Sequence, residues 1–177
     1  MIHSIQRRLA ARHENGEGGF TLIELMVVVM IIAILVGIAI PAFLGARRRA
    51  QDTASKSDLR NALGTAQTIF TDNQAYLATA AMVTSLGSEE PSLTFQSDTT
   101  KSTAAKQISL ATAASTSGGT LDTIILASES GSGTCFYFRH VATAGLTTSG
   151  TYSATTGSGT DCQAGNAPTA ATAWTAL

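Results

Sequence analysis

The sequence predicts an α+β fold, in which a long N-terminal helix packs on a small antiparallel sheet and a disulfide region follows at the C-terminus. A charge-free apolar run over 25–46 and an amphipathic pattern that continues to residue 73 predict the helix. Apolar segments between glycine-containing turns over 121–155 predict the strands. At 177 residues the chain has room for one modest globular domain and a membrane segment.

The apolar run Leu25–Ala46 has 22 residues, and none of them is charged. As a helix it would be about 33 Å long, which is enough to span the hydrocarbon core of a bilayer. A cleavable secretory signal fits less well, because its apolar core has only about 7–15 residues; residues 37–39 could mimic its cleavage site. The arginines before the run, Arg7, Arg8 and Arg12, favour a cytoplasmic N-terminus. The arginines after it weaken the argument for this orientation: Arg47, Arg48 and Arg49.

The segment Gly-Gly-Phe-Thr-Leu-Ile-Glu (18–24) leads directly into this run and places one carboxylate at its head. A plain signal anchor would explain the run but not this segment. The segment resembles the processing signature of type IV pilins and of type II secretion pseudopilins. This resemblance implies a pilin-like fold, cleavage between Gly19 and Phe20 by a prepilin peptidase that removes residues 1–19, and N-methylation of Phe20. It is strong over 18–51 and diffuse beyond, and it leaves the pilin subclass open.

Glu24 is a candidate assembly residue, because a carboxylate beside an apolar run is costly without a partner. Cleavage would create a positive amine on Phe20, four residues before Glu24. The family resemblance implies that Glu24 of an incoming subunit pairs with the Phe20 amine of its neighbour, which offsets the cost of burying both charges in a filament core. The alternative is that Glu24 rests at the cytoplasmic membrane interface.

Gly37 and Pro41 are a candidate helix break within the apolar run. The resemblance implies that the helix loosens around Gly37–Pro41 when subunits pack into a filament. The alternative is a simple kink, because proline removes one backbone donor and both residues are tolerated in membrane helices.

The helical pattern continues beyond the membrane-length run. Leu59, Leu63, Ala66 and Phe70 recur at helical spacing, with charged residues mostly off that stripe. We therefore expect one helix from about 21 to 72, made of an apolar part (20–46) and an amphipathic part (47–73) whose stripe needs a sheet to cover it. The alternative is a hinge at 47–49 between two separate helices.

Residues 74–177 are expected to form a globular head. A short helical or irregular patch is predicted over 77–86, and a surface loop with a strand at 107–111 as part of it over 94–120. Three strands are predicted over 121–128, 134–142 and 146–155, the first two separated by the turn 131–133. In the second strand, alternation places Cys135, Tyr137, Arg139 and Val141 on one face and Phe136, Phe138 and His140 on the other.

Cys135 and Cys162 are the two cysteines, and they lack the spacing of a metal site. In a domain exported past a membrane anchor they are expected to form a disulfide. Closing this loop adds about 3–4 kcal/mol of stability on the chain-entropy model. The alternative is two unpaired thiols in a cytosolic domain.

The sequence offers no catalytic or cofactor motif: it contains no P-loop, Rossmann fingerprint, zinc pattern or nucleophile elbow. We therefore expect neither an enzyme nor a protein with a cofactor or a metal. His3 and His13 lie in the predicted leader, His140 is expected on a strand surface, and Glu89-Glu90 is expected to be a solvated pair.

The function that the resemblance implies is a structural subunit of a type IV pilus, a helical homo-oligomer. Its precursor would cross the cytoplasmic membrane once, meet the peptidase/N-methyltransferase and the assembly machinery, and end in an extracellular pilus that supports adhesion, surface motility or DNA uptake. A type II secretion pseudopilin is the alternative, which the two cysteines disfavour because major pseudopilins commonly lack that disulfide. A DNA-binding minor pilin has little support, because the net charge is −1 and few basic residues lie beyond the membrane flank: Lys56, Arg60, Lys101, Lys106 and Arg139.

Overall fold

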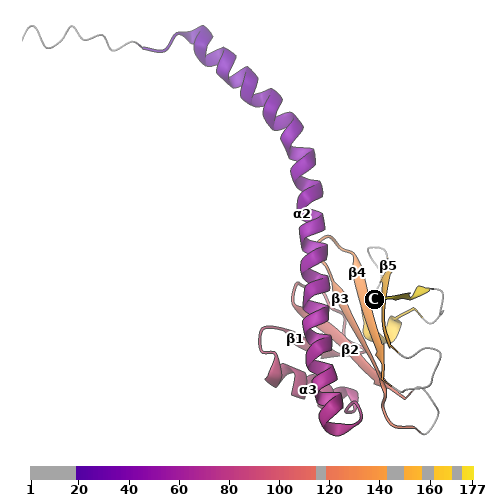
Figure 1. The fold of residues 1–177 in the computed structure, drawn as a ribbon. Helices are drawn as coiled ribbons and strands as arrows, with labels where there is room; N and C mark the ends of the chain where they lie inside the picture. The colour runs from indigo at the N-terminus through magenta and orange to yellow at the C-terminus, as the bar shows by residue number, and fades with distance from the viewer. Residues whose placement is uncertain (1–18, 115–118, 143–149, 157–161, 169–172) are drawn as a thin grey trace, which may run out of the picture. The chain divides into compact units, whose positions relative to one another are not determined.

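The computed structural model describes residues 19–114, 119–142, 150–156, 162–168 and 173–177. The chain divides into two compact units, Met1–Leu44 and Gly45–Leu177, which we call the first and second units. The helix α2 (Leu22–Asn73) has 52 residues and contributes to both (Figure 1). The single long helix expected from the sequence is therefore confirmed, and the predicted leader (1–19) lies outside the described residues except for Gly19.

The second unit contains a six-stranded sheet with the strand order β1-β2-β3-β4-β5-β6. After α2 the chain forms the helix α3, the strands, the short 3-10 helix η1 and a last strand: α3 (Thr79–Glu89), β1 (Thr94–Ser97), β2 (Gln107–Ala113), β3 (Thr123–Glu129), β4 (Cys135–Val141), β5 (Gly150–Thr156), η1 (Ala164–Asn166) and β6 (Thr175–Ala176). Strand neighbours pair antiparallel except β1 and β2, which are parallel. The predicted antiparallel sheet is thus confirmed for β2 to β6 and wrong at the β1 edge.

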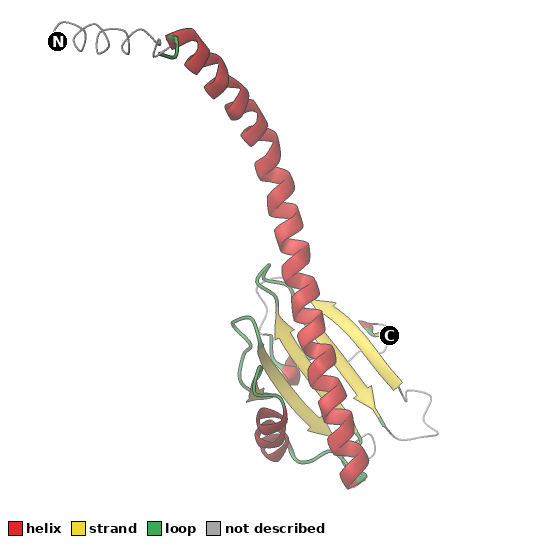
Figure 2. Ribbon diagram, turned by 60° about the vertical axis from the view of Figure 1, so that its left-hand side comes forward, coloured by secondary structure: helices red, strands yellow, loops and turns green. Residues whose placement is uncertain are grey.

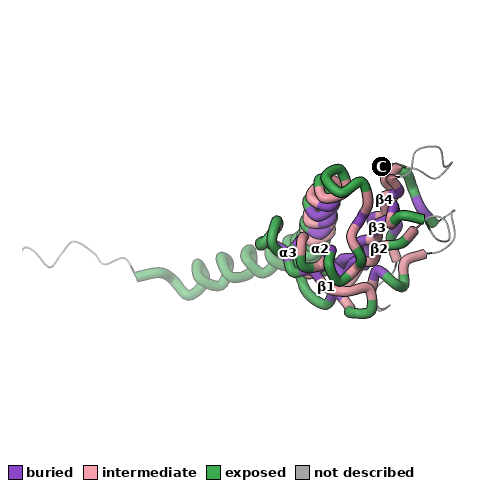
Figure 3. The backbone as a smooth tube through the Cα atoms, turned by 90° about the horizontal axis from the view of Figure 1, so that it is seen from below, coloured by how far each residue is buried: buried purple, intermediate pink, exposed green. Residues whose placement is uncertain are grey.

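One face of the sheet packs against the second-unit part of α2 (Figure 2). The stripe predicted on this helix is buried, with Leu59, Ala62 and Ala66 fully inaccessible and Leu63 6% exposed. These side chains form the larger core cluster together with Met82 and Leu86 of α3 and with sheet residues such as Ile108, Leu110, Ile124, Leu126, Phe136 and Phe138. Figure 3 shows the same division along the chain, with α2 exposed throughout the first unit and buried on one side beside the strands.

The opposite face of the sheet holds a second, smaller core cluster beneath the C-terminal segment. It contains Cys135 and Tyr137 of β4 together with Cys162, Ala164 and Trp174. The alternation predicted for 134–142 is therefore confirmed, since Phe136 and Phe138 join the helix-side cluster and Cys135 and Tyr137 join this one. Residues 157–161 and 169–172, on either side of Cys162, lie outside the described residues.

The region predicted as a surface loop, 94–120, is where the expectation failed most. The strand expected at 107–111 is confirmed as β2, but the region also contains β1, and Phe95, Ile108 and Leu110 are buried in the helix-side core. Its many alanine, serine and threonine residues dilute the apolar pattern, so periodicity alone did not reveal β1. The last predicted strand, 146–155, corresponds to β5, which begins at Gly150, and residues 143–149 lie outside the described residues.

Candidate functional site

The apolar part of α2 is exposed along its whole first-unit length. Every large apolar side chain between residues 22 and 44 is at least 46% exposed, and Leu22 is 76% exposed. This helix is long and apolar enough to cross a membrane, by length and composition alone. A helix that is apolar on all sides belongs in lipid or in a protein core. The surface of this segment therefore requires a partner, either bilayer or other helices.

The N-terminus of α2 is fixed by a local cap. The Glu24 backbone N–H donates to Thr21 Oγ1 at 3.2 Å, and the Leu25 N–H donates to the Thr21 carbonyl at 3.2 Å. Thr21 therefore caps the helix, and Thr21 and Glu24 have the Thr-x-x-Glu spacing of a capping box. A carboxylate in the first helical turn is also stabilised by the helix dipole. The capping hydrogen bond is accepted by the Thr21 hydroxyl, and Glu24 takes part in it through its backbone N–H.

The bond predicted to be cut lies just outside this cap. Gly19 and Phe20 precede the helix, and both residues are exposed. Phe20 is 83% exposed, and a side chain added at Gly19 would meet no atom within 4 Å. An uncovered peptide bond of this kind is accessible to a processing enzyme. Cleavage between Gly19 and Phe20 and methylation of Phe20 nevertheless stay predictions.

Gly37 and Pro41 lie within the continuous helix α2. A side chain added at Gly37 would meet no atom within 4 Å, so this glycine serves no close contact in the isolated chain. The expected loosening of the helix concerns the packed filament, and it stays a prediction.

A polar cluster ties α2 to the turn between β3 and β4. Asp52 of the helix accepts hydrogen bonds from the hydroxyls of Ser130 and Ser132, at 2.6 and 2.5 Å. Burial raises the pKa of Asp52, but these two hydrogen bonds and nearby Lys56 outweigh burial, so its pKa is lowered overall. The cluster was not predicted, because serines after a strand carry no sign of a partner 78 residues away.

Three further contacts join the same helix to strands β3 and β4. Ser55 and Ser128 are both buried, and their hydroxyls lie 3.0 Å apart in a hydrogen bond. The next residue, Lys56, has its Nζ 4.7 Å from the centre of the Phe136 ring, and about one turn further on Arg60 Cζ lies 5.9 Å from that of Phe138. These cation–π contacts cover the edge of the core that Leu59 and Ala62 fill.

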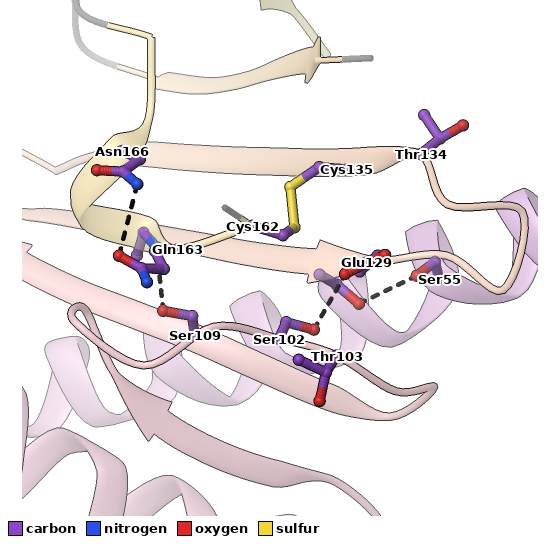
Figure 4. The surroundings of a disulfide bond; sticks show 12 residues. Ser55, Ser102, Thr103, Ser109, Glu129, Thr134, Cys135, Cys162, Gln163 and Asn166 are labelled. Atoms are coloured by element: carbon purple, nitrogen blue, oxygen red, sulfur yellow. Dashed lines mark hydrogen bonds between the residues drawn. A yellow bond between two sulfur atoms is a disulfide. The ribbon is translucent and has the colours of Figure 1, made fainter. Parts of the chain in front are cut away.

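The expected disulfide is present between Cys135 and Cys162, whose Cα atoms are 5.6 Å apart (Figure 4). Hydrogen bonds hold the segment after Cys162 to the β1–β2 edge: the Ser102 N–H donates to the Cys162 carbonyl, and the Ala164 N–H donates to Ser109 Oγ, both at 3.0 Å. The disulfide therefore fixes the C-terminal segment across the sheet. One of its cysteines is on β4, and the segment after the other cysteine is hydrogen-bonded near β2.

His140 lies on β4 as expected, but it is half-buried on the helix side of the sheet and not fully at the surface. Its Nδ1 and the hydroxyl of buried Tyr76 lie 2.6 Å apart in a hydrogen bond. Burial lowers the pKa of His140 and raises that of Tyr76.

Of the predicted solvated pair, Glu89 is exposed at the end of α3 and Glu90 accepts a hydrogen bond from Ser92. No group of metal-binding side chains occurs in the described part of the chain.

A family model, the prokaryotic N-terminal methylation motif, matches residues 15–40. This match covers Gly19, Phe20, Glu24 and the beginning of the exposed apolar helix. The chain therefore carries a segment similar to the prokaryotic N-terminal methylation motif.

Two curated relatives are similar to part of this chain, and both are named as type IV pilus proteins. The type IV wide pilus major component PilA4 of Thermus thermophilus is 45% identical over 69 residues, which are 39% of this chain and 53% of that protein. The type IV major pilin protein PilA of Myxococcus xanthus is 49% identical over 60 residues, 34% of this chain and 27% of that protein. The matches thus span about half and about a quarter of the relatives' lengths. No solved structure matches significantly.

Proposed function

We propose that this chain is a structural, non-enzymatic subunit of a type IV pilus, and a major one, as the names of its two relatives state for those proteins. The observation that supports this most is the apolar part of α2, whose large side chains are all exposed over 22–44. Such a surface fits two surroundings in turn, first the lipid around a single-pass precursor and then the helices of neighbouring subunits.

Processing precedes assembly in this proposal. A prepilin peptidase cuts the exposed bond between Gly19 and Phe20, and the new N-terminus is methylated. Glu24 then pairs with the Phe20 amine of a neighbouring subunit in the filament, because two opposite charges in an apolar core must be paired. The assembly machinery moves the subunit from the cytoplasmic membrane to an extracellular pilus that serves adhesion, surface motility or DNA uptake.

The capping box allows a sharp test of the charge on Glu24. Glu24→Gln keeps a side chain that can complete the box but removes the charge. Thr21→Val removes the capping oxygen but keeps the charge. We expect Glu24→Gln to leave the precursor in the membrane and to abolish the filaments that can be sheared from cells. We expect Thr21→Val still to form these filaments. Normal filament yield from Glu24→Gln would contradict the pairing role, and loss in Thr21→Val alone would assign the effect to helix capping.

Processing and localisation have their own test. The mass of the chain and of its N-terminal fragment is measured in membranes and in material sheared from cells. A chain beginning at N-methylated Phe20 in the sheared fraction is expected. An uncut chain confined to membranes would indicate a signal-anchored protein and would contradict the proposed function.

A secretion pseudopilin remains the second candidate, since the methylation motif is shared. The disulfide between Cys135 and Cys162 supports the pilus over this candidate. Deleting the gene for this chain distinguishes the two candidate functions. For a pilus subunit we expect surface filaments to be lost while protein secretion stays intact. The opposite result is expected for a pseudopilin.

A further inference from the structure

The face of the sheet opposite α2 carries a pocket of about 460 Å³. Its lining is dominated by small or apolar side chains of the strands and the C-terminal segment, among them Ala111, Ala113, Ile125 and Val141. This volume lies within the range of small-molecule sites, roughly 300–1,000 Å³. Within the lining, Arg139 of β4 is the charged residue.

Two aromatic rings hold the Arg139 guanidinium at this pocket. Its central carbon lies 4.9 Å from the centre of the Tyr152 ring and 4.7 Å from that of the Trp174 ring. The Trp174 ring is itself fixed, because its indole N–H donates to the Pro168 carbonyl at 2.7 Å. Cation–π contacts of this kind orient a guanidinium without using its N–H donors.

The guanidinium has no anionic partner among the described residues. Its Nε atom is buried and makes no hydrogen bond there, and no carboxylate of those residues forms an ion pair with it. A buried N–H donor without an acceptor costs free energy, and the half-buried Arg139 cation would be favoured by an anion that accepts from it. The described part of the chain therefore leaves this site without a negatively charged oxygen acceptor.

We propose that this pocket binds a small carboxylate with an aliphatic body. The carboxylate accepts hydrogen bonds from Arg139, whose planar fork matches its two oxygens. The aliphatic body lies on Ala111, Ala113 and Ile125. One cation in an otherwise apolar lining suits a monoanion better than a phosphate dianion. This site lies in the second unit and does not depend on the proposed role in a filament.

The chain offers a direct probe, because Trp174 is its sole tryptophan and lines the pocket. The full chain in dodecyl maltoside micelles is titrated with hexanoate in carboxylate-free buffer while tryptophan fluorescence is recorded. Hexanamide, which has the same shape without the charge, is the ligand control. We expect a saturable change with hexanoate and binding at least about tenfold weaker with hexanamide. A linear response or equal responses to both compounds would overturn the proposal.

Two variants assign the response to the site. Arg139→Gln should weaken hexanoate binding at least about tenfold, since it removes the charge. Arg60→Gln is the matched control, because Arg60 also lies over an aromatic ring, that of Phe138, but on the helix side of the sheet. Binding by Arg60→Gln should stay within about twofold of the unaltered chain. Equal affinities for the two variants would overturn the proposal.

A third variant guards against an effect of Arg139→Gln on folding. Ala113 is exposed and lines the pocket, so Ala113→Leu fills it without changing a charge or a core residue. We expect this variant to unfold like the unaltered chain and to lose hexanoate binding. Retained binding in the folded Ala113→Leu protein would place the ligand elsewhere.

Discussion

The two parts of α2 use the same kinds of side chain for different purposes. In the first unit, leucine, isoleucine and valine surround the helix and remain exposed. In the second unit the apolar side chains of the helix are reduced to one stripe, in which Leu59, Ala62 and Ala66 are fully buried by the sheet and α3. The apolar surface of the second unit is therefore already used for folding, and that of the first unit is available to lipid or to other subunits. Stability of the fold and assembly should thus respond to different substitutions.

The largest expected effect tests this difference with one substitution made in both parts. Leu59→Ala should lower the free energy of unfolding by about 2–5 kcal/mol, because it leaves a cavity in a closed core. Leu35→Ala should leave unfolding unchanged, since Leu35 is 61% exposed. Urea unfolding of the full chain, followed by Trp174 fluorescence, measures both. Equal losses of stability would mean that the two parts of the helix do not differ in this way.

The disulfide should account for the next largest effect, and only within the second unit. Replacing Cys135 and Cys162 together with serine should lower the free energy of unfolding by about 3–4 kcal/mol, because it opens a loop with a sequence separation of 27. Reducing agent should do the same to the unaltered chain and nothing further to the variant. Membrane insertion of the first unit, followed by fractionation, should not change; a loss of insertion would couple the two units.

A smaller effect is expected from the polar cluster that holds the β3–β4 turn to α2. Asp52→Asn should cost about 1 kcal/mol, because Ser130 and Ser132 lose a charged acceptor that is only half-buried. The folded pKa of Asp52 is lowered, so this contribution is present above about pH 4 and is lost as the pH falls through the folded pKa. Unfolding of the variant and of the unaltered chain at several pH values should converge in acid.

Asp58→Asn is the matched control on the same helix. Burial raises the pKa of Asp58, although Lys106 opposes this, so its charge costs stability at neutral pH. Its removal should therefore be neutral or slightly stabilising. A loss of stability equal to that of Asp52→Asn would show that general charge, not the cluster with the two serines, is responsible.

The smallest effect concerns His140. Because burial lowers its folded pKa, the unfolded chain binds more protons between that pKa and about 6.5. The stability of the second unit should therefore decline gently as the pH falls below 6.5. His140→Gln should remove this part of the decline, which thermal unfolding between pH 5 and 8 would show. An unchanged pH profile in the variant would exclude His140 as its source.

Some elements of the fold could be predicted from the sequence and others could not. The extent of α2, its buried stripe and the two faces of β4 were predicted, because each repeats with the period of its own secondary structure. The strand β1 and its parallel pairing with β2 were missed, since β1 has four residues and no alternation that stands out from its polar neighbours. The methylation motif was found as a local segment, but the capping role of Thr21 became visible only with its hydrogen bond to the Glu24 backbone.

The sequence by itself determined the long helix, its division into an apolar and an amphipathic part, the motif at 18–24 and the availability of two cysteines. These features are local or periodic, so neighbouring residues are enough to define them. Only the tertiary structure decided that Asp52 meets the serines of the β3–β4 turn, that Tyr76 meets His140, and that Arg139, Tyr152 and Trp174 gather at one pocket. Such contacts join residues far apart in the chain, and they depend on strand order and register, which one sequence does not encode as a readable pattern.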